Sequence, residues 1–298
     1  MRRYMPLLVV AAGAFVSAFQ PTQTHLAFQQ NQRHVTKKSP STIPCTWPPL
    51  DSCVTHSCLQ MISSASSDEG KVDTHALGKY AAAIGLQLGT IAATFKLLDF
   101  GIEAVSVPLP AISLLFYVMS LRSRIFSPLN NRRPNLKQVT SGGKTQGFRD
   151  RVMPSWTPPG VFFPVMWILI ISPLRAYSST LIFEANGGHL CDPTILALML
   201  HLTVGDTWNT INNVERRMGA SVIGVFCVLL SALFVSYKYY QVVPIAGKLL
   251  GLTCLWLATA SALITDTWRL NPLEGGKRDK LYPVVGNSTT KFVFESEI

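Results

Sequence analysis

Two ionisable side chains stand inside long apolar runs of this sequence. Arg175 follows an uncharged run over 157–174, and Asp206 closes a run over 193–205. Ionisable residues buried in a membrane are costly and are generally paired. If the two segments are antiparallel neighbours, the charges differ in depth by roughly 4 residues, about 6 Å along a helix. The pattern predicts an Arg175–Asp206 ion pair; the alternative is that Arg175 snorkels to the poorly charged face.

No constellation of catalytic or metal-ligating residues accompanies these charges. The apolar runs contain no metal-spaced cluster of His, Cys and Glu and no G-x-S-x-G, and SGGK at 141–144 is too short for a phosphate-binding loop. Three N-terminal cysteines and one histidine match no zinc spacing, namely Cys45, Cys53, Cys58 and His56. We therefore predict no catalytic residue and no metal site.

The elements that must position the charges are long and apolar. The 298-residue chain is 48% hydrophobic and 14% charged, whereas ordinary soluble domains are roughly 25% charged. A helix needs about 20 mostly apolar residues to cross a bilayer. We expect an all-α, polytopic membrane protein with five transmembrane helices, at about 104–121, 158–183, 193–213, 218–238 and 246–267. A Gly- and Ala-rich stretch at 80–95 adds either one extra N-terminal helix or an amphipathic preface.

Lysine and arginine are distributed unevenly between the predicted loops. The formal net charge is +10. Basic residues gather in the 122–151 loop, at 216–217 and in the tail from 269, which share one side if there are five spans. The opposite side has only Lys238 and Lys248. We expect the basic side to be cytosolic or stromal, and because no basic helix is interleaved with aromatic residues, we expect no nucleic-acid partner.

The N-terminal segment has the composition of a targeting leader. Residues 1–18 combine two arginines, a short apolar core and small residues, as a signal peptide does. The acid-free, hydroxyl-rich segment that follows is typical of a transit peptide. The two together resemble bipartite plastid-targeting leaders of algae, with cleavage before Phe19; the alternative is plain secretion into the endomembrane system. We divide the chain into a signal peptide at 1–18, a transit peptide and linker at 19–75, a transmembrane domain at 76–271 and a tail at 272–298.

A tryptophan among prolines opens the second predicted span. Trp156 is followed by Pro158 and Pro159, and then by Phe163 and Trp167. We expect both prolines in the first helical turn, where a missing N–H costs nothing. Trp156 is then at the membrane interface, and Trp167 lies about 16 Å further along the helix axis.

Two further motifs end the third and fifth spans. One is a tryptophan followed eight residues later by R-R-x-G, formed by Trp208, Arg216, Arg217 and Gly219. The other runs from W-x-x-x-A to W-R-x-N and contains Trp256, Ala260, Leu263, Trp268, Arg269 and Asn271. As a set and in this order, the three motifs resemble those of the TspO/MBR family, the tryptophan-rich sensory or translocator proteins, over about 104–271.

The sequence departs from the family pattern at several positions near these motifs. Val161 replaces a second tryptophan after the prolines, Gly205 replaces an asparagine before Trp208, and Ile264 replaces an asparagine in the fifth span. The chain is therefore identified as a divergent member, whose ligand can differ from those of its relatives.

The resemblance implies a five-helix bundle with a pocket near the first-loop face. Family members bind porphyrin and haem, and animal members also bind sterol. The resemblance implies no required cofactor; the partners it implies are membrane lipids, a tetrapyrrole (porphyrin or haem) or sterol ligand, and optionally a second copy in a homodimer. Its ligand-binding residues correspond here to Trp156, Pro158, Pro159, Phe163, Trp167, Trp208, Trp256 and Ala260.

Several alternatives to this interpretation stay open. The aromatic residues can simply pack helices and anchor them at the interface. Arg149 and Arg151 can meet ligand carboxylates at the pocket mouth. His201 is either an axial haem ligand or a hydrogen-bonded helical histidine. Binding without catalysis, in tetrapyrrole handling or stress signalling, is the expected function; transport of such ligands and light-dependent porphyrin degradation are its rivals.

Overall fold

The computed structural model describes residues 70–105, 107–132, 151–286 and 289–295. The expected signal peptide, the expected transit peptide and linker up to residue 69, the N-terminal cysteines and Arg149 lie outside these residues. The described residues form long helices with no β-strand beyond two isolated bridges. The helices are α3 (Thr74–Ala104), α4 (Leu109–Arg122), α6 (Phe162–Val165), α7 (Ser172–Ala185), α8 (Pro193–Thr210), α9 (Met218–Val242) and α10 (Pro244–Leu270). Two π-helical segments continue this series, η3 (Met166–Ile171) between α6 and α7 and η4 (Ile211–Glu215) after α8, and short 3₁₀ turns are η2 (Ser123–Phe126), η5 (Glu274–Gly276) and η6 (Val293–Glu295).

Local signals explain where several helices begin. The Asp73 carboxylate accepts a hydrogen bond from the Ala76 N–H at the start of α3, and Asp192 accepts one from the Thr194 N–H at the start of α8. These are N-caps, which satisfy amide groups that a helix leaves free at its first turn. Pro193 and Pro244 are the first residues of α8 and α10, a position that tolerates proline.

Five helices of the described chain are long and apolar enough to cross a membrane: Thr74–Ala104, Leu109–Phe126, Phe162–Ala185, Met218–Val242 and Pro244–Leu270. This confirms the expected fold class, but one member of the expected set differs. The stretch at 80–95 is part of the long helix α3, whereas the expected span at 193–213 corresponds to α8 and is not among the five. Helix α8 contains His201, Asp206 and Asn209 and is less apolar than those five helices.

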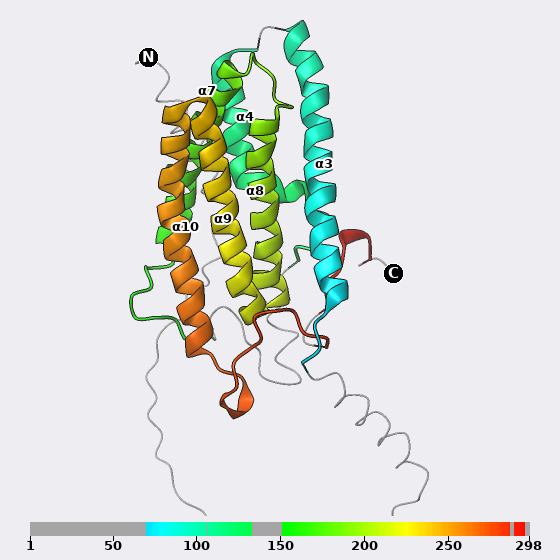
Figure 1. Ribbon diagram of the computed structural model, residues 1–298, viewed down its shortest axis with the longest axis vertical. Helices are drawn as coiled ribbons and strands as arrows, with labels where there is room; N and C mark the ends of the chain where they lie inside the picture. The colour runs from blue at the N-terminus through cyan, green and yellow to red at the C-terminus, as the bar shows by residue number, and fades with distance from the viewer. Residues whose placement is uncertain (1–69, 106, 133–150, 287–288, 296–298) are drawn as a thin grey trace, which may run out of the picture. The chain divides into compact units, whose positions relative to one another are not determined.

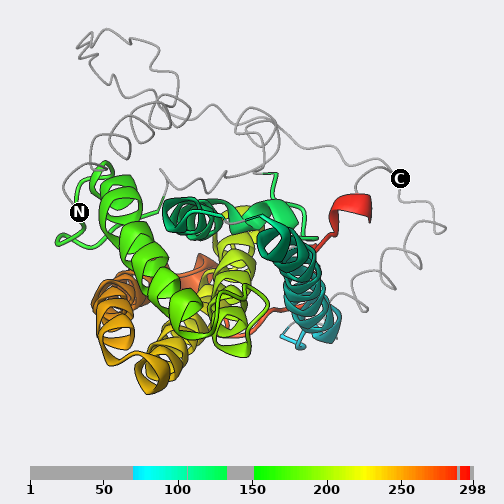
Figure 2. The same ribbon diagram turned by 90° about the horizontal axis from the view of Figure 1, so that it is seen from above.

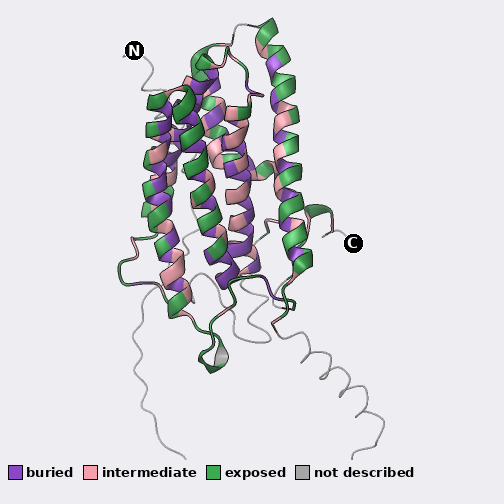
Figure 3. Cartoon of the chain, viewed as in Figure 1, coloured by how far each residue is buried: buried purple, intermediate pink, exposed green. Residues whose placement is uncertain are grey.

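The helices lie side by side, and α8 is the most enclosed of them. Packing runs from α4 to α7, α7 to α10, α10 to α9, α9 to α8 and α8 to α3 (Figures 1 and 2). Purple and pink residues dominate α8, whereas α3, α9 and α10 carry many exposed positions (Figure 3). Several of those exposed side chains are large and apolar, including Leu97, Leu230 and Leu255. The apolar side chains that point outward from these helices suit contact with lipid. Helix α8 lies among them and carries buried polar residues such as His201 and Asp206.

Chain segments on the basic side of the sequence meet at one end of the helices. The Asp73 N–H donates to the Pro283 carbonyl, the Asn130 N–H to the Lys291 carbonyl, and the Val152 N–H to Asn271 Oδ1. At the opposite end, the Asp99 carboxylate accepts hydrogen bonds from the N–H groups of Leu190 and Cys191. The described parts of the 122–151 loop and of the tail thus share one face with the 216–217 pair, as their charge predicted; we call it the basic face.

The prolines of the first motif lie before the helix and not in its first turn. The helix begins at Phe162, whose N–H donates to the Pro159 carbonyl, while Thr157 N–H closes a turn onto Pro154. Our expectation of a start at 158 was wrong. A residue that precedes proline is disfavoured in the α region, so Pro159 disfavours a helical conformation at Pro158.

Candidate functional site

The segment around Trp167 is wound as a π-helix. Over Met166–Ile171 the hydrogen bonds step back by five residues, and the Ser172 N–H donates to the Trp167 carbonyl. The next donor in this pattern would be residue 173, but Pro173 has no N–H. The Ile168 carbonyl left over accepts a hydrogen bond from the Tyr117 hydroxyl of α4 at 3.2 Å. π-Helical segments inside α-helices are frequent at functional sites.

Trp167 and Trp208 meet the same apolar cluster. Both indoles are partly buried against a group formed by α9 and α10, namely Val228, Ala232, Cys254 and Leu257. The Trp208 Nε1–H reaches the carbonyl and hydroxyl of Ser221, each at 3.0 Å. Gly224 allows the close approach, because a Cβ there would lie 2.8 Å from Trp208 Cδ1. The structure therefore brings together two of the predicted ligand residues from η3 and α8.

Trp256 forms a second aromatic group with the start of the α6 segment. Its ring lies 5.6 Å from Phe162 and 5.8 Å from Phe163 between centroids, a favourable range for aromatic pairs. Trp256 is 9% exposed, and its Nε1–H is buried with no hydrogen-bond partner among the described residues. Ala260, one turn further along α10, is partly exposed. This group and Trp167 line the seam between the α6–η3 segment and α10.

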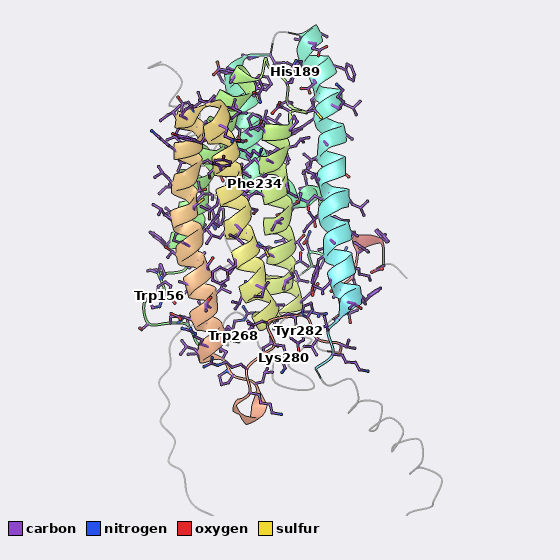
Figure 4. All side chains as sticks on the ribbon, in the orientation of Figure 1. Trp156, His189, Phe234, Trp268, Lys280 and Tyr282 are labelled. Atoms are coloured by element: carbon purple, nitrogen blue, oxygen red, sulfur yellow. The ribbon has the colours of Figure 1, made fainter. Side chains whose placement is uncertain are left out.

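The remaining residues of the first motif stand outside this seam. Trp156 is 44% exposed, and its Nε1–H donates to Asp266 Oδ2 at 3.1 Å. Figure 4 shows it beside α10 near the basic face. Pro158 is partly buried and Pro159 is exposed, and both precede the helix that carries Trp167.

A hollow of about 340 Å³ opens between α9 and α10 on the outer surface. Two of its lining residues contact tryptophans or their neighbours. Asp266 accepts the hydrogen bond of Trp156, and Leu229 packs on the same apolar cluster as Trp167 and Trp208. The hollow is not the first-loop pocket that the family resemblance implied, because it is lined by α9 and α10 alone.

Arg175 and Asp206 do not form the predicted ion pair. Arg175 Nη2 lies 2.6 Å from His201 Nε2, and Asp206 Oδ2 accepts a hydrogen bond from Gln87 Nε2 at 2.8 Å. Gln87 also donates to the carbonyl of Ser123. The partner of Asp206 comes from α3, the helix that sequence left undecided, so the pairing could not be foreseen. Its one signal was the helical spacing of Ala83, Gln87 and Ile91 along a buried face.

The R-R-x-G and W-R-x-N motifs anchor the C-terminal tail at the basic face. Arg217 bonds Asp73 Oδ2 at 3.0 Å and Glu215 at 3.1 Å, and the Gly219 N–H donates to Asp279 Oδ2. A Cβ at Gly219 would lie 2.0 Å from the Lys280 carbonyl oxygen. Trp268 Nε1–H donates to the Asp279 carbonyl, at the end of the helices where Figure 4 places Lys280 and Tyr282. These motif residues thus have structural roles.

Arg151 lies at the same face and contacts the end of the third expected span. Its Nη1 and Nη2 donate to the side chain and carbonyl of Asn212. Burial, with the nearby Arg216 as a second cause, lowers the pKa of Arg151 below its ordinary value. Asn212 Oδ1 accepts hydrogen bonds from Arg151 Nη1 and from the Ser221 hydroxyl.

The fold and the aromatic seam define a polytopic helical membrane protein. Residues 134–269 match the TspO/MBR family. The chain is 30% identical to the Translocator protein of Homo sapiens over 129 residues, 42% of this chain and 75% of that protein. It is 24% identical to Protein CrtK of Rhodobacter capsulatus over 121 residues, 41% of this chain and 76% of that protein. The chain therefore belongs to the TspO/MBR family, as its three motifs predicted.

Proposed function

We propose that this protein binds a flat or elongated apolar ligand, of the tetrapyrrole or sterol class, along the seam between the α6–η3 segment and α10, without catalysing its conversion. One observation carries the proposal. The Trp256 indole N–H is buried beside two phenylalanine rings and has no acceptor among the described residues. A buried donor without a partner is costly, and a bound ligand with an oxygen or nitrogen acceptor would satisfy it.

The surroundings of Trp256 suit such a ligand. Sites for small molecules combine mostly apolar and aromatic walls with a few polar groups that fix orientation. Phe163, Trp167 and Trp256 provide aromatic surface along one seam, and Trp208 packs on the neighbouring cluster. The family name and the relatives support a ligand-handling role in membranes, while the tetrapyrrole or sterol itself is our proposal.

The test measures protoporphyrin IX binding by the full chain in lipid nanodiscs, from the change in porphyrin absorbance above empty nanodiscs. Trp256→Phe removes the N–H and keeps an aromatic ring, so we expect an affinity about two- to tenfold lower, the worth of one hydrogen bond. Trp167→Ala should lower it further. Phe234→Ala changes an exposed aromatic on the outer face of α9 and serves as the control with unchanged affinity.

Two results would contradict the proposal. One is the absence of binding at micromolar porphyrin together with absent binding of a fluorescent sterol. The other is an equal loss in the Trp256 and Phe234 variants, which would indicate a general effect on the lipid-facing surface.

We further propose that the N-terminal segment directs the protein to a plastid membrane through the secretory route. The support is its composition, a signal-like segment followed by an acid-free one. A fusion of residues 1–60 to a fluorescent protein, expressed in an alga with secondary plastids, should accumulate in the plastid. Fluorescence confined to the endoplasmic reticulum or the medium would support plain secretion instead.

A further inference from the structure

Arg175 is a fully enclosed cation in the middle of a membrane-spanning segment. It lies within Phe162–Ala185 and is 3% exposed, so it does not snorkel to either surface. A guanidinium is charged at all working pH values, and charge at this depth is expected to face a partner or a functional group. The question is which group neutralises it.

The protein supplies Arg175 with a neutral partner. His201 Nδ1 lies 2.8 Å from the Ser231 hydroxyl oxygen, and that hydroxyl donates to the Val228 carbonyl. The hydroxyl therefore accepts from an Nδ1–H, which leaves Nε2 as an unprotonated acceptor for the Arg175 Nη2–H at 2.6 Å. This network orients both side chains, and because the imidazole is neutral it brings no negative charge into contact with the guanidinium.

The guanidinium keeps binding capacity beyond this bond. Within the described part of the chain, Nη2 is its only nitrogen with a hydrogen-bond partner, and Nε is buried without one. No carboxylate of the described residues forms an ion pair with it, and Asp206 is bonded to Gln87. Arg175 thus presents N–H donors and a full charge in an enclosed site.

Arg175 is joined to the aromatic seam through Trp167. Its Cζ lies 5.2 Å from the centroid of the Trp167 ring, and that ring packs on the cluster of α9 and α10. A ligand with an apolar body along the seam and an acidic group at one end would place that group beside the guanidinium. Arginine matches a carboxylate in both charge and hydrogen-bond geometry.

We propose that Arg175, oriented by His201, binds the carboxylate of a lipophilic acid inside the membrane. The inference rests on the proposed ligand function and narrows its ligand to an amphipathic carboxylate. Two sources share this chemistry, the propionate of a porphyrin and the headgroup of a free fatty acid.

The experiment compares acids with matched esters on the full chain in phosphatidylcholine nanodiscs. Protoporphyrin IX and its dimethyl ester share one apolar body, and cis-parinaric acid with its methyl ester represents the fatty acids. We expect the wild type to bind at least one acid about tenfold to a hundredfold more tightly than its ester, the worth of a charge-assisted hydrogen bond. Arg175→Gln should remove this preference by weakening the acid alone, and Arg175→Lys should keep part of it.

Lys248→Gln is the matched control, because it removes one positive charge at an exposed position of α10 and should leave the acid-to-ester ratio unchanged. The wild-type ratio needs no variant, so the comparison holds even if Arg175→Gln does not fold. A preference for the fatty acid alone, lost in Arg175→Gln, would support the carboxylate site and identify the fatty acid, and not the porphyrin propionate, as the source of the carboxylate.

The carboxylate site would be overturned by equal wild-type affinities for both acids and their esters. Equal porphyrin affinities would leave ligand binding along the seam intact. The site would also be overturned if Arg175→Gln weakened acid and ester alike, since that pattern marks a structural role.

Discussion

At the residue scale, small and polar side chains decide how closely the helices and the tail approach. Gly219 sits against the Lys280 backbone and Gly224 against Trp208, and both approaches exclude a side chain. The sequence marks Gly219 through the R-R-x-G motif, but its contact with residues some sixty positions later is a tertiary fact. The R-R-x-G motif therefore positions the tail against the start of α9.

Gly219→Ala should destabilise the protein by about 1–3 kcal/mol, because the added methyl group would overlap the Lys280 carbonyl and force a backbone shift. Thermal unfolding in detergent measures the change. Gly251→Ala is the matched control within α10, where a Cβ meets no atom within 4 Å; helix propensity alone should make it up to about 1 kcal/mol more stable. Similar melting temperatures for the two variants would refute the close contact.

At the element scale, the π-helical segment η3 is the feature that places Trp167. Pro173 removes a backbone donor, and Tyr117 of α4 supplies the missing hydrogen bond to the Ile168 carbonyl. The sequence shows Pro173 plainly, but it does not show which neighbouring side chain compensates. Helix α3 illustrates the same limit, because its pairing through Gln87 gives Asp206 a partner that no local pattern specifies.

Tyr117→Phe should lower the free energy of unfolding by about 1–3 kcal/mol, the cost of a buried carbonyl without a donor. In a Pro173→Ala background the cost should be smaller, since residue 173 then has an N–H of its own. Tyr177→Phe is the control for loss of a hydroxyl, because Tyr177 is exposed and lies in the span that contains Ile168 and Pro173. Additive effects of the Tyr117 and Pro173 substitutions would show that the two do not share the Ile168 carbonyl.

At the scale of the whole molecule, the tail ties the basic ends of the helices to one another. It contacts α9 at Gly219 and the start of α3 through Asp73, whose N–H donates to Pro283. Lys79 of α3 pairs with Glu295 at 2.7 Å. We call the described residues 279–286 and 289–295 the tail strap.

The tail strap should loosen in acid. Burial raises the pKa of Asp73, but hydrogen bonds from the Ala76 N–H and Arg217 outweigh it, so the net shift is downward. The Lys79 hydrogen bond, followed by that of the Phe292 N–H, lowers the pKa of Glu295. A carboxyl group with a lowered folded-state pKa stabilises above its ordinary value of about 4 and loses that contribution as pH falls through the folded-state value.

A pair of spin labels, one on the strap and one at the start of α3, measures this opening. The distance should be constant from neutral pH to about 5 and should lengthen below about 4. Asp73→Asn combined with Glu295→Gln should remove most of the pH dependence, and Glu184→Gln, an exposed carboxyl at the opposite end, should not. An unchanged distance down to pH 3 would contradict the role of these two carboxyl groups.

The sequence alone determined the class and the family of this protein, and it predicted that its basic segments lie at one end of the helices. The evidence was local or periodic: long uncharged runs, three tryptophan motifs in order and the distribution of basic residues. Such properties can be recognised in the sequence itself, because they do not depend on which segments pack together. The tertiary structure decided which side chains pair and which helices are neighbours. Arg175 pairs with His201 and not with Asp206, Trp156 binds Asp266 outside the seam, and α3 is a full helix that covers α8. Such pairings depend on helix rotation and on which helix lies alongside, and in a chain whose helices are apolar on most faces the hydropathy pattern specifies neither.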